Sequence, residues 1–417
     1  MKYVTLERLY YGDKAEYQKV YQERFNSENT IKLNFYIKNH QAFFMQTPYI
    51  THLFFDTLRT DKHIAKLCSE LPSSAITQFA YRCLIDEILV TNKIEGVYST
   101  RKEVSETLLS IVEKENDSLN SHKRFWGLTA KYAKLGSNDL VSLNTAQDIR
   151  SLYNEIVLPE VIDEDPSNNP DGKIFRKDSA SVKTSTDKEI HRGIYPESKI
   201  IEAVESALGF LNDKSIEPFY RICIFHYLLE YIHPFYDGNG RLGRFIVSQT
   251  LSKELTSLIS YRISTTITEN INLYYAAFKT CNNPHNLGDL TPFLLMMAEM
   301  LNISIHHLST ALENRLVRVR RYEEFIPELP YGTDDRLGNL YTLLIQAGLF
   351  SEKGLTYNYL SEVLHCSYGT VRKDLKKIDS SKYLIKKREG NRLFFMADID
   401  KLDDLYLPKN DTANIEH

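Results

Sequence analysis

Cysteine is scarce in this chain, and its positions form no pattern. The 417 residues include five cysteines, which are Cys68, Cys83, Cys223, Cys281 and Cys366. An odd number of scattered cysteines predicts neither a disulfide framework nor a metal site, because both need paired or closely spaced thiols. Free thiols are typical of a reducing compartment, so we expect the protein to be cytoplasmic.

Long apolar runs are also absent. The longest, Leu290 to Ile303, is interrupted by Glu299 and is too short to cross a bilayer. The stretch from Met1 to Gln18 carries charges throughout and lacks the apolar segment of a signal peptide. We therefore expect no membrane partner.

No charge of one sign dominates the chain. Its formal net charge is −4, so no global basic field indicates nucleic acid. With 42% hydrophobic and 25% charged residues, the composition is that of an ordinary globular protein. The length allows two or three domains, each with its own core.

Apolar residues recur at helical spacing through most of the sequence, so the predicted fold is mainly α. Residues 1 to about 70 are interpreted as mostly helical. Ser74 to Val97 is a clear helix, and we place Trp126 in the core. The stretch from Ile216 to Ile232 is apolar almost all round, which is typical of a central buried helix.

The most informative stretch follows that central helix. His233 to Arg244 reads His-Pro-Phe-Tyr-Asp-Gly-Asn-Gly-Arg-Leu-Gly-Arg. Pro234 stops the helix and leaves His233 at its end, where the imidazole is a candidate general base. Asp237 is a hard oxygen ligand suited to Mg²⁺.

A glycine turn and a helix start come next. Gly238, Asn239 and Gly240 allow backbone N–H groups to point outward. The helix expected from residue 241 to about residue 255 has unpaired N–H groups in its first turn, which favour an anion. Arg241 and Arg244 share one face of that turn, and guanidinium groups bind phosphate. Each feature alone is usually structural, but together they predict a polyphosphate site.

This stretch resembles the Fic family motif, His-x-Phe-x-(Asp/Glu)-Gly-Asn-Gly-Arg-x-x-Arg, at every fixed position. The resemblance covers about Ile85 to Ile305 and implies a Fic-type helical bundle that transfers AMP from ATP to a protein hydroxyl, releasing pyrophosphate. It also implies Mg²⁺ as cofactor. Relatives that phosphorylate carry Lys at the place of Gly240, and relatives that transfer phosphocholine carry Ala at the place of Gly238. Both glycines therefore favour nucleotidyl transfer.

The resemblance also implies roles for single residues. His233 would deprotonate the target hydroxyl, Asp237 would hold Mg²⁺ and Phe235 would anchor the loop. Five residues would bind the phosphates of ATP through side chains or backbone amides, namely Gly238, Asn239, Gly240, Arg241 and Arg244. Of the two arginines, the first would bind the β-phosphate and the second the γ-phosphate.

A second motif lies upstream, where Gly96 is expected to cap the helix of residues 74–97. Glu95 would face the negative end of that helix dipole, so it requires a positive partner. Thr91 to Gly96 resembles the inhibitory motif of one Fic class, (Ser/Thr)-x-x-x-Glu-(Gly/Asn). The resemblance implies that Glu95 pairs with Arg244 at the γ-phosphate position, which leaves ATP in a non-productive pose.

A hairpin is predicted between the two motifs. Ser181 to Ile194 contains two short extended runs around a polar tip, and it is the only clear hairpin in this half of the chain. Its position is similar to that of the Fic flap, which pairs with the backbone of a target. The target-docking candidates are Val182, Ile190 and His191. An ordinary surface loop is the alternative.

A separate module is predicted near the C-terminus. Three helices and a hairpin between Leu337 and Met396 resemble a winged helix-turn-helix. From Ser351 to Met396, ten Lys and Arg residues outnumber five Asp and Glu residues. The residues expected to face a DNA groove are Tyr368, Thr370, Arg372, Lys373, Lys376 and Lys377. Contact with a protein is the alternative.

The predicted organisation is thus a Fic-type helical bundle with a β-hairpin flap, plus a C-terminal winged-helix domain. Residues 1–112 form an N-terminal helical region with the inhibitory helix at about 75–97, residues 113–306 the catalytic domain, and residues 325–405 the winged helix.

Three functions are compatible with this organisation. The first is an autoinhibited adenylyltransferase that modifies Ser, Thr or Tyr of a target protein or of itself. The second is an enzyme that removes AMP at the same site. The third is a nucleotide-responsive transcriptional regulator that binds DNA. A homodimer is compatible with the resemblance, and the target protein is not identified.

Overall fold

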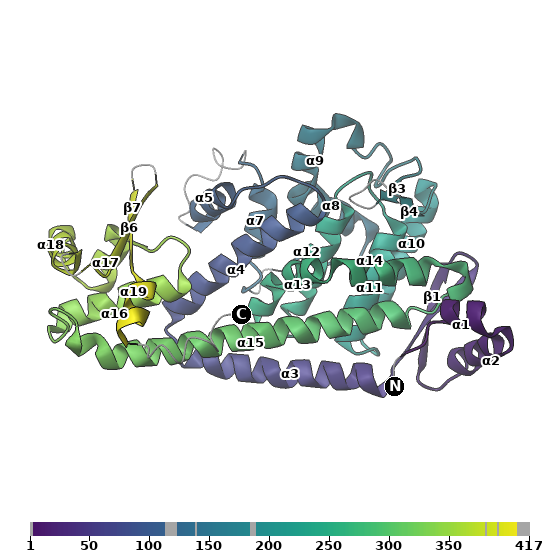
Figure 1. The fold of residues 1–417 in the computed structure, drawn as a ribbon. Coiled ribbons are helices and arrows are strands. Elements are labelled where there is room, and N and C mark those ends of the chain that lie inside the picture. The colour runs from purple at the N-terminus through teal and green to yellow at the C-terminus, as the bar shows by residue number, and fades with distance from the viewer. Residues whose placement is uncertain are drawn as a thin grey trace. The chain divides into compact units, whose positions relative to one another are not determined.

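The computed structural model describes residues 3–112, 123–137, 140–183, 189–379, 382–389 and 392–406. As predicted, the fold is mainly helical (Figure 1). Two compact units are present: unit 1 contains residues 1–61 and 84–306, and unit 2 contains residues 62–83 and 307–417. The predicted functional ranges, 1–112, 113–306 and 325–405, stay predictions.

Unit 1 opens with two helices and a hairpin: α1 (Leu6–Gly12), α2 (Lys14–Phe25), β1 (Thr30–Ile37) and β2 (His40–Met45). The strands are antiparallel. The prediction of a mostly helical region was therefore wrong for residues 30–45, and the hairpin predicted at residues 181–194 is not the only one. Leu33, Phe35 and Ile37 are buried and alternate with exposed residues, a period of two that is typical of a strand.

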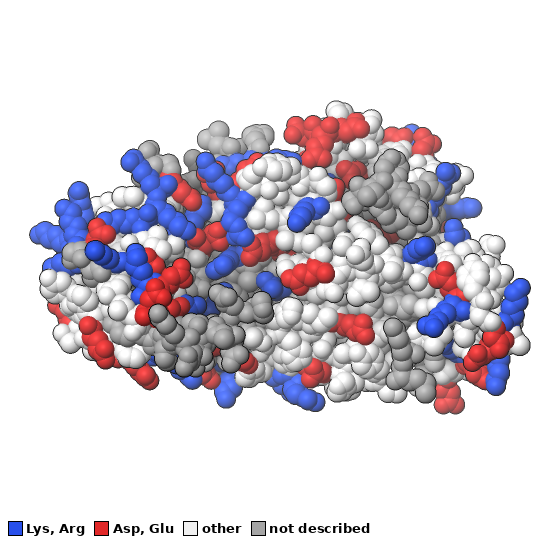
Figure 2. All heavy atoms as spheres, viewed as in Figure 1, with Lys and Arg blue, Asp and Glu red and all other residues white. Residues whose placement is uncertain are grey.

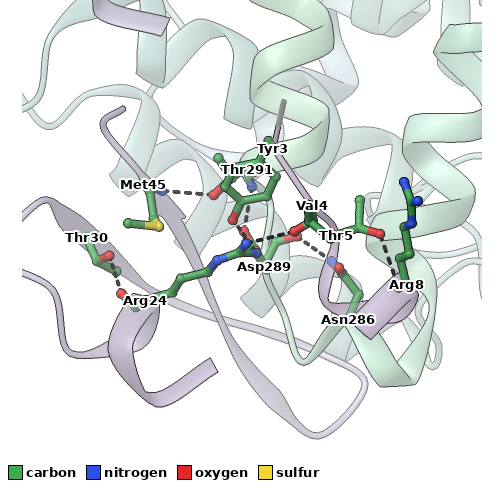
Figure 3. Close-up of polar contacts among 10 residues, drawn as sticks. All are labelled: Tyr3, Val4, Thr5, Arg8, Arg24, Thr30, Met45, Asn286, Asp289 and Thr291. Atoms are coloured by element: carbon green, nitrogen blue, oxygen red, sulfur yellow. Dashed lines mark hydrogen bonds and ion pairs between the residues drawn. The ribbon is translucent and has the colours of Figure 1, made fainter. Parts of the chain in front are cut away.

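A buried carboxylate ties the N-terminal segment to a distant loop (Figure 3). Asp289 accepts hydrogen bonds from the Tyr3 hydroxyl at 2.5 Å, from Arg24 at 3.3 Å and from the backbone N–H of Thr291 at 2.9 Å. Burial raises the pKa of Asp289, and these donors oppose that effect. A buried charge is tolerated only with such partners, so the segment before α1 is held in place by them.

The remaining helices and strands of unit 1 include one central helix, α11, and the elements around it. They are α3 (Pro48–Ser69, to residue 61), α4 (Ser73–Ile94, from residue 84), α5 (Arg101–Val112), α7 (Trp126–Ala133), α8 (Ala146–Ile156), α9 (Leu158–Glu164), β3 (Ser181–Lys183), β4 (Glu189–Arg192), α10 (Glu197–Leu211), α11 (Pro218–Ile232), α12 (Asn239–Leu251), α13 (Ile263–Glu269), α14 (Ile271–Asn282) and α15 (Thr291–Phe325, to residue 306). Helix α11 is buried on nearly every face, as predicted.

One core prediction in this unit was wrong. Trp126 is only partly buried, whereas its neighbour Phe125 is fully buried. Phe125 precedes α7 in a left-handed conformation with φ of 62°, and its backbone N–H donates to Glu160 at 2.7 Å. That backbone turn directs the phenylalanine side chain inward in place of the tryptophan.

Unit 2 combines helices with a small sheet. Besides the parts of α3, α4 and α15 that belong to it, it contains α16 (Asp335–Phe350), α17 (Tyr357–Val363), α18 (Tyr368–Asp379), α19 (Ile399–Tyr406), β5 (Leu355–Thr356), β6 (Leu384–Glu389) and β7 (Arg392–Ala397). The sheet is antiparallel with the order β5-β7-β6. Leu355 and Thr356 form the short strand β5, and α17 starts directly after it at Tyr357. The winged-helix interpretation stays a prediction.

None of the described helices is long and apolar enough to span a membrane. The five cysteines all lie in the described part, and none of them forms a disulfide bond there.

Candidate active site

The end of α11 sets the position of His233. This residue caps the helix in the left-handed conformation, with φ of 52°, and its N–H donates to the carbonyl of Leu229 at 2.9 Å. Six residues later the chain re-enters a helix, because Gly238 adopts φ of 78° and α12 begins at Asn239. The helix therefore starts two residues before the predicted position, and Arg241 and Arg244 lie within its first two turns.

The loop between the two helices is held by side chains within and around it. The amide of Asn239 accepts from the N–H of Phe235 at 3.0 Å and donates to its carbonyl at 2.9 Å. The buried ring of Phe235 stacks on Tyr153 with a centroid distance of 3.6 Å. The Tyr153 hydroxyl donates to the carbonyl of Asp237 at 3.0 Å. In this structure, Asn239 thus braces the loop, while its predicted phosphate contact stays a prediction.

A buried arginine supports the loop from another side. Arg176 is fully buried, and its Nε and Nη2 atoms donate to the carbonyl of His233 at 2.9 and 2.8 Å. Nη2 also donates to the carbonyl of Ile194, at 2.9 Å, beside the hairpin. The contact with the His233 carbonyl fixes the backbone from which the imidazole projects. The contacts of Arg176 and Tyr153 were not predicted from the sequence, because their partners are far away in the chain.

These segments surround a cleft of about 390 Å³. Its walls are Lys93–Gly96 at the end of α4, Ser181 and His191 in the hairpin, Glu230, Tyr231 and His233 around the end of α11, Tyr236–Gly240, Arg244, and Tyr274, Tyr275, Phe278 and Asn282 on α14. The structure therefore brings Glu95 and most of the predicted loop residues together in one cavity. It also places both α14 tyrosines beside them.

Arg244 is paired inside this cleft. Its Nη2 atom lies 2.8 Å from Oε1 of Glu95, and its Nε and Nη2 donate to the side chain and carbonyl of Thr91 at 2.8 and 3.0 Å. Burial alone would lower the pKa of Arg244, but the Glu95 carboxylate raises it above its usual value. A Cβ atom at Gly240 would lie 2.1 Å from Oε1 of Glu95, so only glycine at this position lets the carboxylate approach.

Arg241 is different, because it is buried without a close anion. It is 2% exposed, and its nearest ion-pair distance is 3.9 Å, between Nη2 and Oδ2 of Asp237. Its Nε and Nη2 atoms have no hydrogen-bond partner among the described residues. A buried guanidinium group is stable only with a counter-charge, so this geometry suits an anion such as a phosphate.

The environment of His233 keeps its imidazole neutral. Burial, together with the charges of Arg176 and His191, lowers the pKa of His233 to about 3. Its Nδ1 atom has no hydrogen-bond partner among the described residues. A neutral imidazole at physiological pH can accept a proton, which is the property required of a general base.

Asp237 is the one predicted metal ligand. Its side chain is 40% exposed, and its Oδ1 accepts from the N–H of Gly238 at 2.6 Å. The described residues contain no group of three or more His, Cys, Asp or Glu side chains arranged around a common metal position. One carboxylate is nevertheless sufficient for Mg²⁺, which usually binds proteins through one or two carboxylates together with substrate phosphates and waters.

The predicted flap is a hairpin, in which β3 and β4 are antiparallel and Val182 pairs with His191. Residues 184–188 and the side chains of Val182 and Ile190 lie outside the described part. The imidazole of His191 is buried, lies 2.8 Å from the carbonyl of Tyr231 and stacks on the Tyr231 ring. This side chain therefore faces α11, and any docking by His191 would use its backbone.

Two carboxylates in helices near the cleft were not identified from the sequence. Burial raises the pKa of Glu230 to about 8, and its Oε1 atom has no partner among the described residues. Burial raises the pKa of Glu87 to about 7, although Ser264 donates to its carboxylate. Glu230 is the single acidic residue of the apolar helix α11, which was the available signal, whereas α4 contains both Asp86 and Glu87 and gave no such signal. His226 of α11 is buried and lies 2.8 Å from the Tyr274 hydroxyl.

Comparison with known proteins shows a similarity for part of the chain. Residues 144–251 match the Fic/DOC family. This part of the chain is similar to a Fic domain. It extends from the residue before the N-cap of α8 to the last residue of α12 and contains the whole loop from His233 to Arg244.

Relatives of the Fic domain include named enzymes. The protein adenylyltransferase fic-1 of Caenorhabditis elegans is 31% identical over 117 residues, which are 27% of this chain and 21% of that protein. The protein adenylyltransferase Fic of Drosophila yakuba is 26% identical over 208 residues, or 49% of this chain and 38% of that protein. The chain thus spans much less than two thirds of either relative.

The similarity to solved structures is lower. A Fic family protein from Desulfovibrio desulfuricans G20 has a TM-score of 0.49 at 18% identity, covering 84% of this chain and 96% of that one. A fragment of Fic-1 from C. elegans has a TM-score of 0.44 at 19% identity, covering 74% and 81%.

Proposed function

We propose that this protein is an autoinhibited protein adenylyltransferase. It would transfer AMP from ATP to a Ser, Thr or Tyr hydroxyl of a target protein or of itself. The observation that carries the proposal is the 2.8 Å ion pair between Arg244 and Glu95, inside the cleft that also contains His233 and the glycine turn. The names of the adenylyltransferase relatives support the same reaction class.

In the proposed reaction, His233 is the general base. Its neutral imidazole takes the proton of the target hydroxyl, whose oxygen forms a bond to the α-phosphorus of ATP. The bond between that phosphorus and the oxygen bridging to the β-phosphate breaks, and pyrophosphate leaves. Arg176 would act as a positioning residue, because its hydrogen bonds hold the backbone of His233 at the end of α11.

The phosphates would bind at the start of α12. The first N–H groups of a helix have no partner within it and carry a partial positive charge, which favours anions. Arg241 adds a buried guanidinium group whose Nε and Nη2 atoms lack a hydrogen-bond partner among the described residues. Asp237 would hold Mg²⁺, which would offset part of the phosphate charge when bound.

Inhibition follows from competition for one guanidinium group. Glu95 occupies the Nη2 atom of Arg244, which the γ-phosphate of ATP would otherwise contact. Thr91 accepts from Nε of Arg244 and also from the same Nη2 atom, so Arg244 is directed toward α4. Removal of the Glu95 carboxylate should free Arg244 for the nucleotide without altering His233.

The first test is the intact mass of the wild type and of a Glu95→Gly variant after incubation with ATP and Mg²⁺. We expect a mass gain of one or more AMP groups in the variant and little gain in the wild type. Glu95→Gly/His233→Ala is the matched control, and the loss of a general base should slow modification about 10²–10⁴-fold. In Glu95→Gly/Arg244→Ala, productive ATP binding should also be lost.

Other outcomes separate the alternatives. Equal modification of wild type and Glu95→Gly would contradict inhibition by Glu95. If neither protein is modified, both should be given an AMP-modified protein substrate. Loss of AMP from that substrate would replace the proposal by an enzyme that removes AMP.

A further inference from the structure

A second function is indicated in unit 2, where basic side chains gather on one helix and one strand. Helix α18 buries Val371, Asp374, Leu375 and Ile378 on one side. Its opposite side exposes Arg372, Lys373, Lys376 and Lys377. Figure 2 shows Lys and Arg side chains gathered over α18 and the β6–β7 hairpin, which Figure 1 labels.

From Arg372 to Lys377, the exposed side of α18 carries charge of one sign only. Positions 372 and 376, and positions 373 and 377, are four residues apart, and such like-charge pairs destabilise a helix. The two acidic residues of α18 offset little of this charge: Asp374 is buried, bonded to Arg336 and 3.9 Å from Lys377, and Asp379 pairs with Lys386 of β6. A solvated helix face usually mixes both signs, so a uniformly basic face indicates an anionic partner.

The local architecture favours a nucleic acid as that partner. Helix α17 and helix α18 are joined by residues 364–367, with His365 in the left-handed conformation at φ of 48°. Two helices joined by so short a turn are typical of DNA-binding modules, in which the second helix enters the major groove. A helix of 12 residues is roughly 18 Å long, and the groove is about 12 Å wide.

Strand β6 extends the basic surface beside the helix. It is an edge strand of the sheet, and it exposes Lys386, Lys387 and Arg388. Lysines on an edge strand also prevent pairing with another sheet, so β6 alone would not indicate a ligand. That explanation does not apply to α18, which lies outside the sheet.

We propose that the surface formed by α18 and β6 binds duplex DNA through its phosphate backbone. This inference is independent of the proposed transferase activity, because it uses none of the residues of the cleft. Arg372 and Lys376 would contribute directly: both are exposed and one turn apart, and neither forms an ion pair with a described residue.

The test uses the full chain and a fluorescently labelled random-sequence duplex of about two helical turns, with anisotropy as the readout. Arg372→Glu/Lys376→Glu reverses two charges on the proposed surface. Lys62→Glu/Lys66→Glu is the matched control, since it makes the same change at the same spacing on an exposed side of α3 in the same unit. Circular dichroism and thermal unfolding check that each variant folds.

We expect the first variant to bind at least about tenfold more weakly than the wild type, and the control to bind within about twofold. The logarithm of the binding constant should also fall less steeply with the logarithm of the salt concentration in the first variant. Each neutralised phosphate contributes about −0.9 to this slope, and the variant should lose about two phosphate contacts. Failure of the wild type to bind the duplex at low salt would overturn the proposal. So would an equal loss of binding in the two variants.

Discussion

At the scale of single residues, Gly238 is the position where the loop tolerates least change. Its φ of 78° is left-handed, and an added Cβ would lie 2.2 Å from Cγ1 of Val157. We expect Gly238→Ala to lower the free energy of unfolding by about 1–3 kcal/mol, because it adds backbone strain and a clash with a buried side chain. Chemical denaturation followed by circular dichroism measures this change.

Gly209→Ala is the control for that prediction. Gly209 lies in α10, and a Cβ there would meet no atom within 4 Å. This substitution should therefore stabilise the protein by about 0.5–1 kcal/mol, the usual advantage of alanine over glycine in a helix. A Gly238→Ala protein that is as stable as the wild type would show that the turn adapts to a side chain.

The residue scale also shows where sequence reasoning about the site was sufficient. A carboxylate at the negative end of a helix dipole needs a positive partner, and Glu95 does pair with Arg244. The supporting contacts of Tyr153 and Arg176 were out of reach, because their partners are 84 and 57 residues away. No local pattern fixes such distances, so the brace that holds the loop emerged only from the structure.

At the scale of elements, α8 supports one side of the loop from His233 to Arg244 through Tyr153, and the first turn of α8 is well capped. The Thr145 hydroxyl accepts from the N–H of Asp148 at 3.3 Å, and the Asp148 carboxylate accepts from the N–H of Thr145 at 2.8 Å. We expect Thr145→Ala to lower the free energy of unfolding by about 1 kcal/mol. Urea denaturation monitored by far-UV circular dichroism is a suitable measurement.

Asp148→Ala and the double variant extend this prediction to a double-mutant cycle. The two residues satisfy each other's backbone N–H groups, so the loss in Thr145→Ala/Asp148→Ala should be smaller than the sum of the single losses. Strictly additive losses would show that the two residues act separately.

Helices were predicted correctly where apolar residues recur at helical spacing only. Helices α11, α12 and α18 were anticipated from apolar spacing and from breakers such as Pro234. The β1–β2 hairpin was missed, because aromatic residues in residues 30–45 suit both a helix and a strand, and its burial is decided by contacts with other parts of unit 1. One of these contacts joins Phe43 to the loop around Asp289.

At the scale of the whole molecule, a buried acid makes stability depend on pH. Burial raises the pKa of Glu87 to about 7 from 4.5. Between these values the unfolded chain has released this proton while the folded protein retains it. The contribution of Glu87 to the free energy of unfolding therefore decreases as pH rises from 4.5 to about 7.

Glu87→Gln removes this titration while keeping an oxygen that can accept from Ser264. We expect the melting temperature of the variant to fall less between about pH 5 and pH 7 than that of the wild type. Glu202→Gln, at an exposed position of α10, should leave the wild-type pH dependence unchanged. Parallel curves for the wild type and Glu87→Gln would contradict the prediction.

The pairing of Glu95 with Arg244 has a quantitative consequence for the proposed regulation. Because Glu95 belongs to the same chain, the effective concentration of its carboxylate at Arg244 is set by the fold and cannot be diluted. A rise in cellular ATP would compete against this fixed local concentration and not against the abundance of a separate inhibitor. ADP, which lacks the γ-phosphate, would not enter that competition. At a given ATP concentration, the basal activity per molecule would then be independent of the concentration of the protein itself.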